Sequence, residues 1–232
     1  MKAETDFNDY KETYQQEVQQ SIAFSGLDVD FFTEVKARYL VELAQRHFGE
    51  TNSLNVLDIG CGVGLTDRFL IPHFGAMQGV DVAEGLVEKA AEFNTTARYQ
   101  AYDGTRLPFD DNTFDIVFAI CVMHHVPPAQ WESFTKEMRR VTKKGGLAAV
   151  FEHNPFNPLT RLAVNRCEFD ADAVLLRQTK TSALFAGSGF MPKEKRFILF
   201  FPFRKAIFAK LERLINWLPL GAQYYVAAQK TE

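Results

Sequence analysis

Residues 55–66 read Asn55-Val56-Leu57-Asp58-Ile59-Gly60-Cys61-Gly62-Val63-Gly64-Leu65-Thr66. A short apolar run contains an acid near its end, and three alternating glycines then lead into a helix-like segment over 65–70. This order predicts a strand, a tight turn and the start of a helix. Glycine suits the turn because Cβ atoms would block both a positive φ and the close approach of a ligand. The free N–H groups at the helix start favour a carboxylate or phosphate above the turn.

The spacing of the glycines separates two classes of ligand. A dinucleotide-binding turn follows Gly-x-Gly-x-x-Gly, which would place a glycine where this chain has Leu65. The string from Val56 to Gly64 instead resembles, closely, the first motif of class I S-adenosylmethionine-dependent methyltransferases. The resemblance implies that S-adenosylmethionine is the cofactor, and that Asp58, Gly60 and Gly62 hold its methionine end.

The composition describes an ordinary soluble protein. The 232 residues suffice for one α/β domain with a sizeable core, and the 47% apolar content fits this size. A net charge of −3 argues against nucleic acid as a partner. The polar start over 1–6 has no signal-peptide pattern, so we expect a cytoplasmic protein. The three scattered cysteines suggest neither a disulfide nor a thiolate metal site, and Cys61 is interpreted as a small residue that fills the turn.

Apolar runs and helical patterns alternate along the rest of the chain. We expect a first strand that begins at 54, and further strands over 76–82, 98–101, 116–120, 147–151, 197–201 and 222–228. We expect helices over 9–20, 30–48, 65–70, 83–94 and 131–141, and a mostly helical pattern over 161–189. The order predicts an α/β fold with a doubly wound, seven-stranded, mostly parallel sheet and helices on both faces. The family resemblance adds an antiparallel last strand. We divide the chain into an N-terminal helical lid over 1–50 and a methyltransferase domain over 51–232, with a helical insertion at 203–219.

Two further strand ends carry acids. Asp81 ends the second strand, where a carboxylate can accept hydrogen bonds from both hydroxyls of a ribose. The alternative is a surface acid that caps the helix over 83–94. After the third strand, the resemblance implies that Asp103 and Gly104 contact the adenine. Val82 completes the cofactor set on this side.

The fourth strand is an unbroken apolar run, so it should lie centrally in the sheet, and its end reads Cys121-Val122-Met123-His124-His125. This segment resembles the paired-histidine segment of the ubiquinone/menaquinone C-methyltransferase-like group. Ligands bind outside the carboxyl ends of such strands, so we place Cys121 in the cofactor set. A hydroxyl acceptor would need a base, for which the candidates are His125, His124 and His153. The alternative for each is a histidine that is hydrogen-bonded in a loop. Adjacent histidines lack the spacing of a helical ligand pair, so we predict no metal.

The resemblance implies methyl transfer to an acceptor, and the 22 phenylalanines favour an apolar small molecule resembling a quinone, a lipid or a natural product. Two other interpretations stay open, a nicotinamide-dependent oxidoreductase and a noncatalytic interaction protein. Residues 203–219 form a basic amphipathic helix that would rest on a membrane, cover the substrate, or pack on its own domain or a second subunit. We expect a monomer or a homodimer. Tyr10 and Tyr14 of the lid would approach the ligands or serve packing alone.

Overall fold

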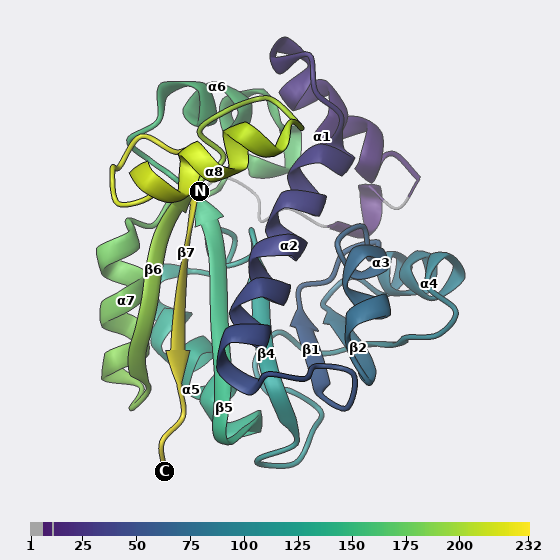
Figure 1. The fold of residues 1–232 in the computed structure, drawn as a ribbon. Helices are drawn as coiled ribbons and strands as arrows, with labels where there is room; N and C mark the ends of the chain where they lie inside the picture. Colours follow the sequence, from purple (N-terminus) through teal and green to yellow (C-terminus); the bar gives the residue numbers. More distant parts are fainter. Residues whose placement is uncertain (1–6, 11) are drawn as a thin grey trace.

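The computed structural model describes residues 7–10 and 12–232. Residues 1–6, which we expected to carry no signal-peptide pattern, lie outside the described residues. A seven-stranded sheet in the order β3-β2-β1-β4-β5-β7-β6 forms its centre (Figure 1). Strand β7 runs antiparallel to both of its neighbours, and the pairs from β3 to β5 are parallel. Strand β4 is central. The prediction of a doubly wound, mostly parallel sheet with an antiparallel ending is confirmed.

The strands are β1 (Asn55–Ile59), β2 (Ala76–Asp81), β3 (Arg98–Ala101), β4 (Phe114–Ile120), β5 (Thr142–His153), β6 (Met191–Ile198) and β7 (Gln223–Gln229). The α-helices are α1 (Tyr14–Ile22), α2 (Val29–Phe48), α3 (Asp67–Leu70), α4 (Glu84–Phe93), α5 (Trp131–Val141), α6 (Pro158–Arg166), α7 (Gln178–Gly187) and α8 (Ala206–Ile215). Among the described residues, no helix combines the length and the apolar character that crossing a bilayer requires.

Alternating residues of the central strands build two separate cores. In β4, Ile116 and Phe118 pack with residues of α2, while Val117 and Ala119 pack with residues of α5 and α7 on the other face. All four side chains are at most 1% exposed. Helix α2 crosses one face of the sheet, as Figure 1 shows. Helices cover both faces of β4, and this explains why its sequence is an unbroken apolar run.

Two expectations about individual elements were wrong, those for β6 and for the first helix, while the mostly helical pattern with short breaks over 161–189 is confirmed. Strand β6 ends at Ile198, whereas we expected it over 197–201, because its exposed edge position allows charged residues that hide the strand pattern. The helical pattern over 161–189 divides into α6, a 3₁₀ turn at Glu168–Asp170 and α7, and residues 173–177 are irregular. The first helix begins at Tyr14 and follows a 3₁₀ turn over Phe7–Tyr10; residue 11 lies outside the described residues.

Candidate functional site

The glycine turn leaves β1 with left-handed backbone at each of its glycines. Gly60 has φ +75°, and its N–H donates to the carbonyl of Val80 over 2.7 Å, which fixes the turn against β2. A Cβ atom at this position would lie 2.4 Å from a methyl group of Val122. The turn therefore requires glycine at position 60 for both its conformation and its space. The expected positive φ is confirmed, whereas the contact with the cofactor stays a prediction.

Asp81 lies buried beneath the same turn. One carboxylate oxygen accepts from the N–H of Gly62 over 2.8 Å, and the other accepts from the N–H of Ala83 over 3.0 Å. Burial raises the pKa of Asp81, and the two backbone donors oppose that rise. Each oxygen keeps a further lone pair. Asp81 thus joins the glycine turn to the start of α4 and can still accept hydrogen bonds from a ligand.

Asp58 and Asp67 form a pair of buried acids below the turn. Burial and the neighbouring Asp67 raise the pKa of Asp58, and burial raises the pKa of Asp67 to about 6. The Oδ1 atom of Asp58 is buried and has no hydrogen-bond partner among the described residues, and Asp58 lines the cavity above. An unsatisfied buried oxygen at a cavity wall is a place for a donor group of a ligand.

The wall on the β2 and β3 side combines apolar surface with one exposed acid. Val82 is exposed and lines the cavity, and one of its methyl groups lies 3.2 Å from the position of a Cβ on Gly104. The carboxylate of Asp103 accepts from the N–H groups of Thr105 and Arg106 over 2.8 and 2.9 Å. These hydrogen bonds lower the pKa of Asp103. Val82, Asp103 and Gly104 therefore lie together at one rim of the cavity, and their contact with the adenine stays a prediction.

Aromatic residues from the N-terminal segment cover the crevice. The ring of Tyr14 stacks on that of Phe169 with centroids 5.2 Å apart, and Phe7 meets Phe169 at 5.9 Å and His125 at 5.0 Å. The Tyr14 hydroxyl lies 3.3 Å from the position of a Cβ on Gly62. Burial and the nearby Asp81 raise the pKa of Tyr14, so its hydroxyl stays protonated. The position of Tyr14 fits the predicted lid, and its hydroxyl lies close to the turn.

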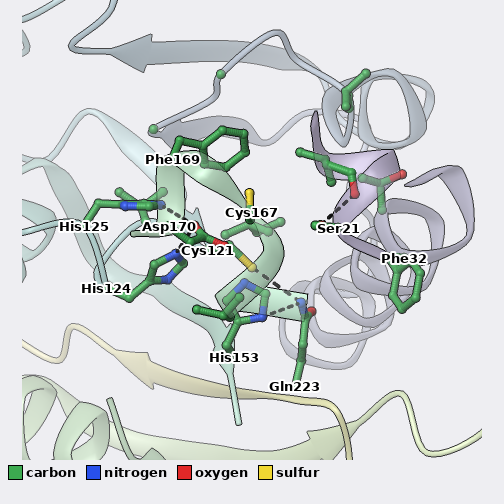
Figure 2. Close-up of a pocket in the computed structure, with 18 of the residues that line it drawn as sticks. Ser21, Phe32, Cys121, His124, His125, His153, Cys167, Phe169, Asp170 and Gln223 are labelled. Atoms are coloured by element: carbon green, nitrogen blue, oxygen red, sulfur yellow. Dashed lines mark hydrogen bonds and ion pairs between the residues drawn. The ribbon is translucent and has the colours of Figure 1, made fainter. Parts of the chain in front are cut away.

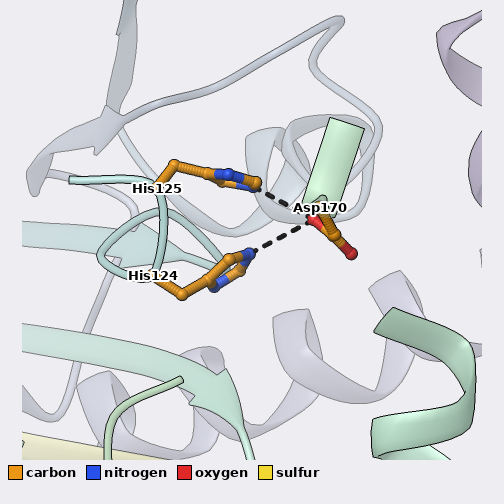
Figure 3. Close-up of side chains that lie close together, drawn as sticks. All are labelled: His124, His125 and Asp170. Atoms are coloured by element: carbon orange, nitrogen blue, oxygen red, sulfur yellow. Dashed lines mark ion pairs between the residues drawn. The ribbon is translucent and has the colours of Figure 1, made fainter. Parts of the chain in front are cut away.

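His124 is held between two carboxylates. Its Nδ1 lies 2.6 Å from Glu152. Its Nε2 lies 3.5 Å from Asp170, as Figure 3 shows for this pair. Burial would lower the pKa of His124, but Glu152 and Asp170 outweigh burial and raise it well above the usual value. A histidine that keeps its proton and uses both nitrogens is a poor base. The geometry favours the hydrogen-bonded alternative for His124.

His125 has the opposite character. Its Nε2 lies 3.2 Å from Asp170, while its Nδ1 is buried and has no hydrogen-bond partner among the residues that the structure describes. Burial and the charge on His124 lower the pKa of His125. A neutral imidazole that donates from Nε2 to a carboxylate keeps a lone pair on Nδ1. His125 is therefore the candidate base that the geometry supports best.

His153 is paired with a thiol. Burial would lower the pKa of His153, but its contact with Cys121 outweighs burial and raises it. Burial would likewise raise the pKa of Cys121, but Lys36, at 3.9 Å from its sulfur, and His153 together lower it. Gln223 donates to the Cys121 sulfur over 3.6 Å. Figure 2 shows Cys121, His153 and Gln223 together, with His124 beside them.

We expect Cys121 to be alkylated by iodoacetamide faster than the two other cysteines. Burial raises the pKa of Cys61 and of Cys167, whereas Cys121 is partly exposed and its pKa is lowered, and the thiolate is the reactive form. Cys121 also has φ +59°, which turns it out of the strand end. Peptide mapping measures the three rates, and S-adenosylhomocysteine should slow the reaction at Cys121. Equal rates would contradict the lowered pKa of the Cys121 thiol, and absence of protection would contradict its place in the cofactor set.

A single cavity of about 1010 Å³ joins these groups. Its lining includes every residue that the sequence singled out for the cofactor or for catalysis. It also includes Lys36, Asp170 and Gln223, which sequence reasoning missed. Glu152, which holds His124, follows an apolar strand run just as Asp58 and Asp81 do, so the same signal could have identified it.

Residues 56–146 match a family model described as "Methyltransferase domain". The chain is 34% identical over 103 residues to a 2-methyl-6-phytyl-1,4-hydroquinone methyltransferase of Synechocystis sp., with 43% of this chain and 32% of the relative covered. It is 34% identical over 128 residues to a sterol 24-C-methyltransferase of Gibberella zeae, with 52% and 33% covered. The chain thus spans about a third of the length of these two relatives.

Solved structures agree on the fold. A chain of the complex between the Haloferax volcanii Trm112 methyltransferase activator and a methyltransferase superposes with a TM-score of 0.68 at 16% identity, and 99% of this chain and 100% of that chain are covered. A SAM-dependent methyltransferase from Aquifex aeolicus gives 0.62 at 15% identity, with 92% and 98% covered. At these identities the likeness concerns the fold alone. The family model and the curated relatives agree that residues 56–146 are similar in sequence to a methyltransferase domain, and the fold of the chain is the one that solved S-adenosylmethionine-dependent methyltransferases share.

Proposed function

We propose that this protein transfers the methyl group of S-adenosylmethionine to an apolar small molecule that loses a proton in the reaction. One observation carries the proposal: the glycine turn, Asp81, the rim at Asp103 and His125 all line one cavity of about 1010 Å³, and Nδ1 of His125 has no hydrogen-bond partner among the described residues. Cofactor surfaces and a base candidate therefore meet in a space large enough for two ligands.

The residues present fit the cofactor. Gly60 and Gly62 line the cavity with left-handed backbone, Asp81 keeps acceptor capacity for ribose hydroxyls, and the unsatisfied Oδ1 of Asp58 can accept from an ammonium group. Val82 offers an apolar surface for the adenine ring. When bound, S-adenosylmethionine supplies an activated methyl group on a sulfonium. What this chain adds is positioning, because an aligned acceptor needs little covalent assistance.

The base candidate narrows the class of acceptor. A thioether or tertiary amine gives up no proton when it is methylated, whereas a hydroxyl or an aromatic carbon does. His125 would take this proton on Nδ1, and Asp170 would hold the imidazole through Nε2 and stabilise its charged form. The aromatic side chains of Phe7, Tyr14 and Phe169 favour an apolar acceptor beside it. The matched relatives named for a hydroquinone and a sterol support this chemical class.

We expect the acid limb of the kcat profile to lie below pH 6.5, the ordinary pKa of histidine. Since the pKa of His125 is lowered, the imidazole stays neutral at neutral pH, and activity is lost only as the pH falls through that lowered value. Asp170 raises the pKa of His125, so the Asp170→Asn variant should have a lower pKa at His125 and an acid limb at still lower pH. An acid limb above pH 6.5 in the wild type would contradict this role.

We expect activity to survive dialysis against EDTA. His124, His125 and Asp170 form a group whose ligand atoms lie within 4.8 Å of one another and that could hold a metal ion. Metal binding would require His124 to lose the proton that Glu152 and Asp170 stabilise. We therefore keep the prediction of no metal. Loss of activity that zinc or another divalent cation restores would overturn it and assign the ion to this group.

Incubation with methyl-labelled S-adenosylmethionine and fractionated extract tests the proposal and identifies the acceptor. We expect label in an organic-soluble small molecule. A melting temperature that shifts with NAD(H) but not with S-adenosylhomocysteine would favour the oxidoreductase interpretation. Cofactor binding without transfer to any fraction would favour the noncatalytic interpretation.

A further inference from the structure

Helix α8 carries its apolar stripe on the outside. Ile207, Leu211 and Leu214 share one helix face by their spacing, and all three are exposed, Leu214 by 72%. Trp217 and Leu220 continue the exposed apolar surface beyond the helix, and Trp217 is 69% exposed. A surface helix ordinarily turns such a stripe toward the core. We call these five residues the α8 face.

Polar contacts hold α8 in this orientation. Glu212, on the opposite side of the helix, is buried and accepts from the hydroxyl of Tyr39 over 2.7 Å and from the N–H of Phe200 over 2.9 Å. Arg204 and Arg213 form ion pairs with acids of α2 or its N-cap over 2.6 to 2.7 Å. The buried carboxylate requires these donors, so the helix cannot turn its apolar stripe inward without leaving Glu212 unsatisfied.

The exposed apolar surface continues to the mouth of the cavity. The side chain of Asn157 donates to the carbonyl of Leu220 over 2.8 Å, which ties the end of the α8 face to the start of α6. The neighbouring Phe156 and Leu159 are both exposed, and Leu159 also lines the cavity. Figure 1 shows α8 and α6 at the same end of the molecule, beyond the carboxyl ends of the parallel strands.

The segments that form this surface are basic, and the neighbouring acids Asp28, Glu34 and Glu42 pair with Arg204 and Arg213. Residues 203–220 contain four Lys and Arg residues and one acid, the buried Glu212, and residues 154–167 contain two Arg residues and no acid. Lys205 and Lys210 are exposed and stand outside the ion pairs of the described residues. Apolar side chains flanked by exposed cations are complementary to a bilayer with anionic lipids, which takes up both. A second copy of this chain would place like charges against each other.

We infer that the α8 face docks on the surface of an anionic membrane and brings the mouth of the cavity to the lipid. Leu214 and Trp217 enter the apolar layer, while Lys205 and Lys210 meet the headgroups. An acceptor dissolved in the bilayer then reaches the cavity past Leu159; this last step rests on the proposed function, whereas docking itself does not.

Co-sedimentation of the full chain with phosphatidylcholine vesicles, with and without phosphatidylglycerol, tests the inference. We expect binding that requires phosphatidylglycerol and weakens with added salt. Trp217 is exposed and Trp131 is buried, so the fluorescence should shift to the blue on binding, and Trp217→Phe should remove the shift but keep most binding. Leu214→Ser with Trp217→Ser, and separately Lys205→Gln with Lys210→Gln, should each weaken binding roughly tenfold or more.

Phe93→Ser is the matched control, because Phe93 is 63% exposed at the end of α4, away from α8 (Figure 1). It should leave vesicle binding unchanged. Absence of binding at every lipid composition, or equal binding by the control and the α8 variants, would overturn the inference. A dimer that Leu214→Ser dissociates, without vesicle binding, would instead make this face an interface between copies. Calorimetry with S-adenosylhomocysteine on the same samples separates these outcomes from a failure of the cofactor site.

Discussion

Replacement of His125 by asparagine should lower kcat by about 10²–10⁴-fold, the contribution of a positioned general base. The amide keeps polarity at the site but cannot take a proton at the place of Nδ1, which is buried and without a partner among the described residues. We expect little change in the affinity for S-adenosylhomocysteine, because all predicted cofactor contacts except Cys121 lie at the ends of β1, β2 and β3. Label transfer and calorimetry on the same preparation measure the two effects.

His73→Asn is the matched control for this variant, since His73 is exposed at the short turn after α3 and is not among the residues that line the cavity. It should retain wild-type activity. Full activity of His125→Asn, with the fold intact by circular dichroism, would show that no base acts from this position. The acceptor would then belong to a class that loses no proton, or another group would take the proton.

Asp81→Ala and Gly60→Val should each abolish measurable binding of S-adenosylhomocysteine in calorimetry. The first removes the buried carboxylate that accepts from Gly62 and Ala83 and that we assign to the ribose. The second places side-chain atoms where a Cβ alone would lie 2.4 Å from Val122, in a left-handed backbone conformation. Both changes act on the same turn by different physical means.

Thermal unfolding distinguishes a lost site from a lost fold. Asp81→Asn keeps the shape of the side chain and one acceptor oxygen, so it should bind more weakly than the wild type but better than Asp81→Ala. Retained micromolar affinity in both Asp81→Ala and Gly60→Val would contradict the cofactor site. Unfolding of both at the growth temperature would leave Asp81→Asn as the informative variant.

The sequence placed the candidate residues at one cavity where strand ends carry them. Asp58 and Asp81 lie in apolar strand runs, His125 lies in the loop after another, and the carboxyl ends of parallel strands meet at one edge of the sheet. The local sequence pattern was therefore enough to predict where these residues lie in the fold. The glycine turn was also predictable from the sequence, because a positive φ such as that of Gly60 favours glycine over all other residues.

The missed residues come from elements whose position no local pattern specifies. Asp170 lies in a 3₁₀ turn between α6 and α7, and only the tertiary fold brings it to His124 and His125. Lys36 is a buried cation within a helix that otherwise reads as amphipathic. Strand β6 was misplaced because an edge strand needs only part of its surface apolar, so charged residues broke the expected run.

A crystal structure with S-adenosylhomocysteine would test the central claim most directly. The account predicts that the ribose hydroxyls lie within hydrogen-bond distance of Asp81, that the amino-acid end lies over Gly60 and Gly62, and that the adenine lies against Val82. A ligand bound elsewhere, or a groove above the turn that Tyr14 fills while these three strand ends hold nothing, would contradict it.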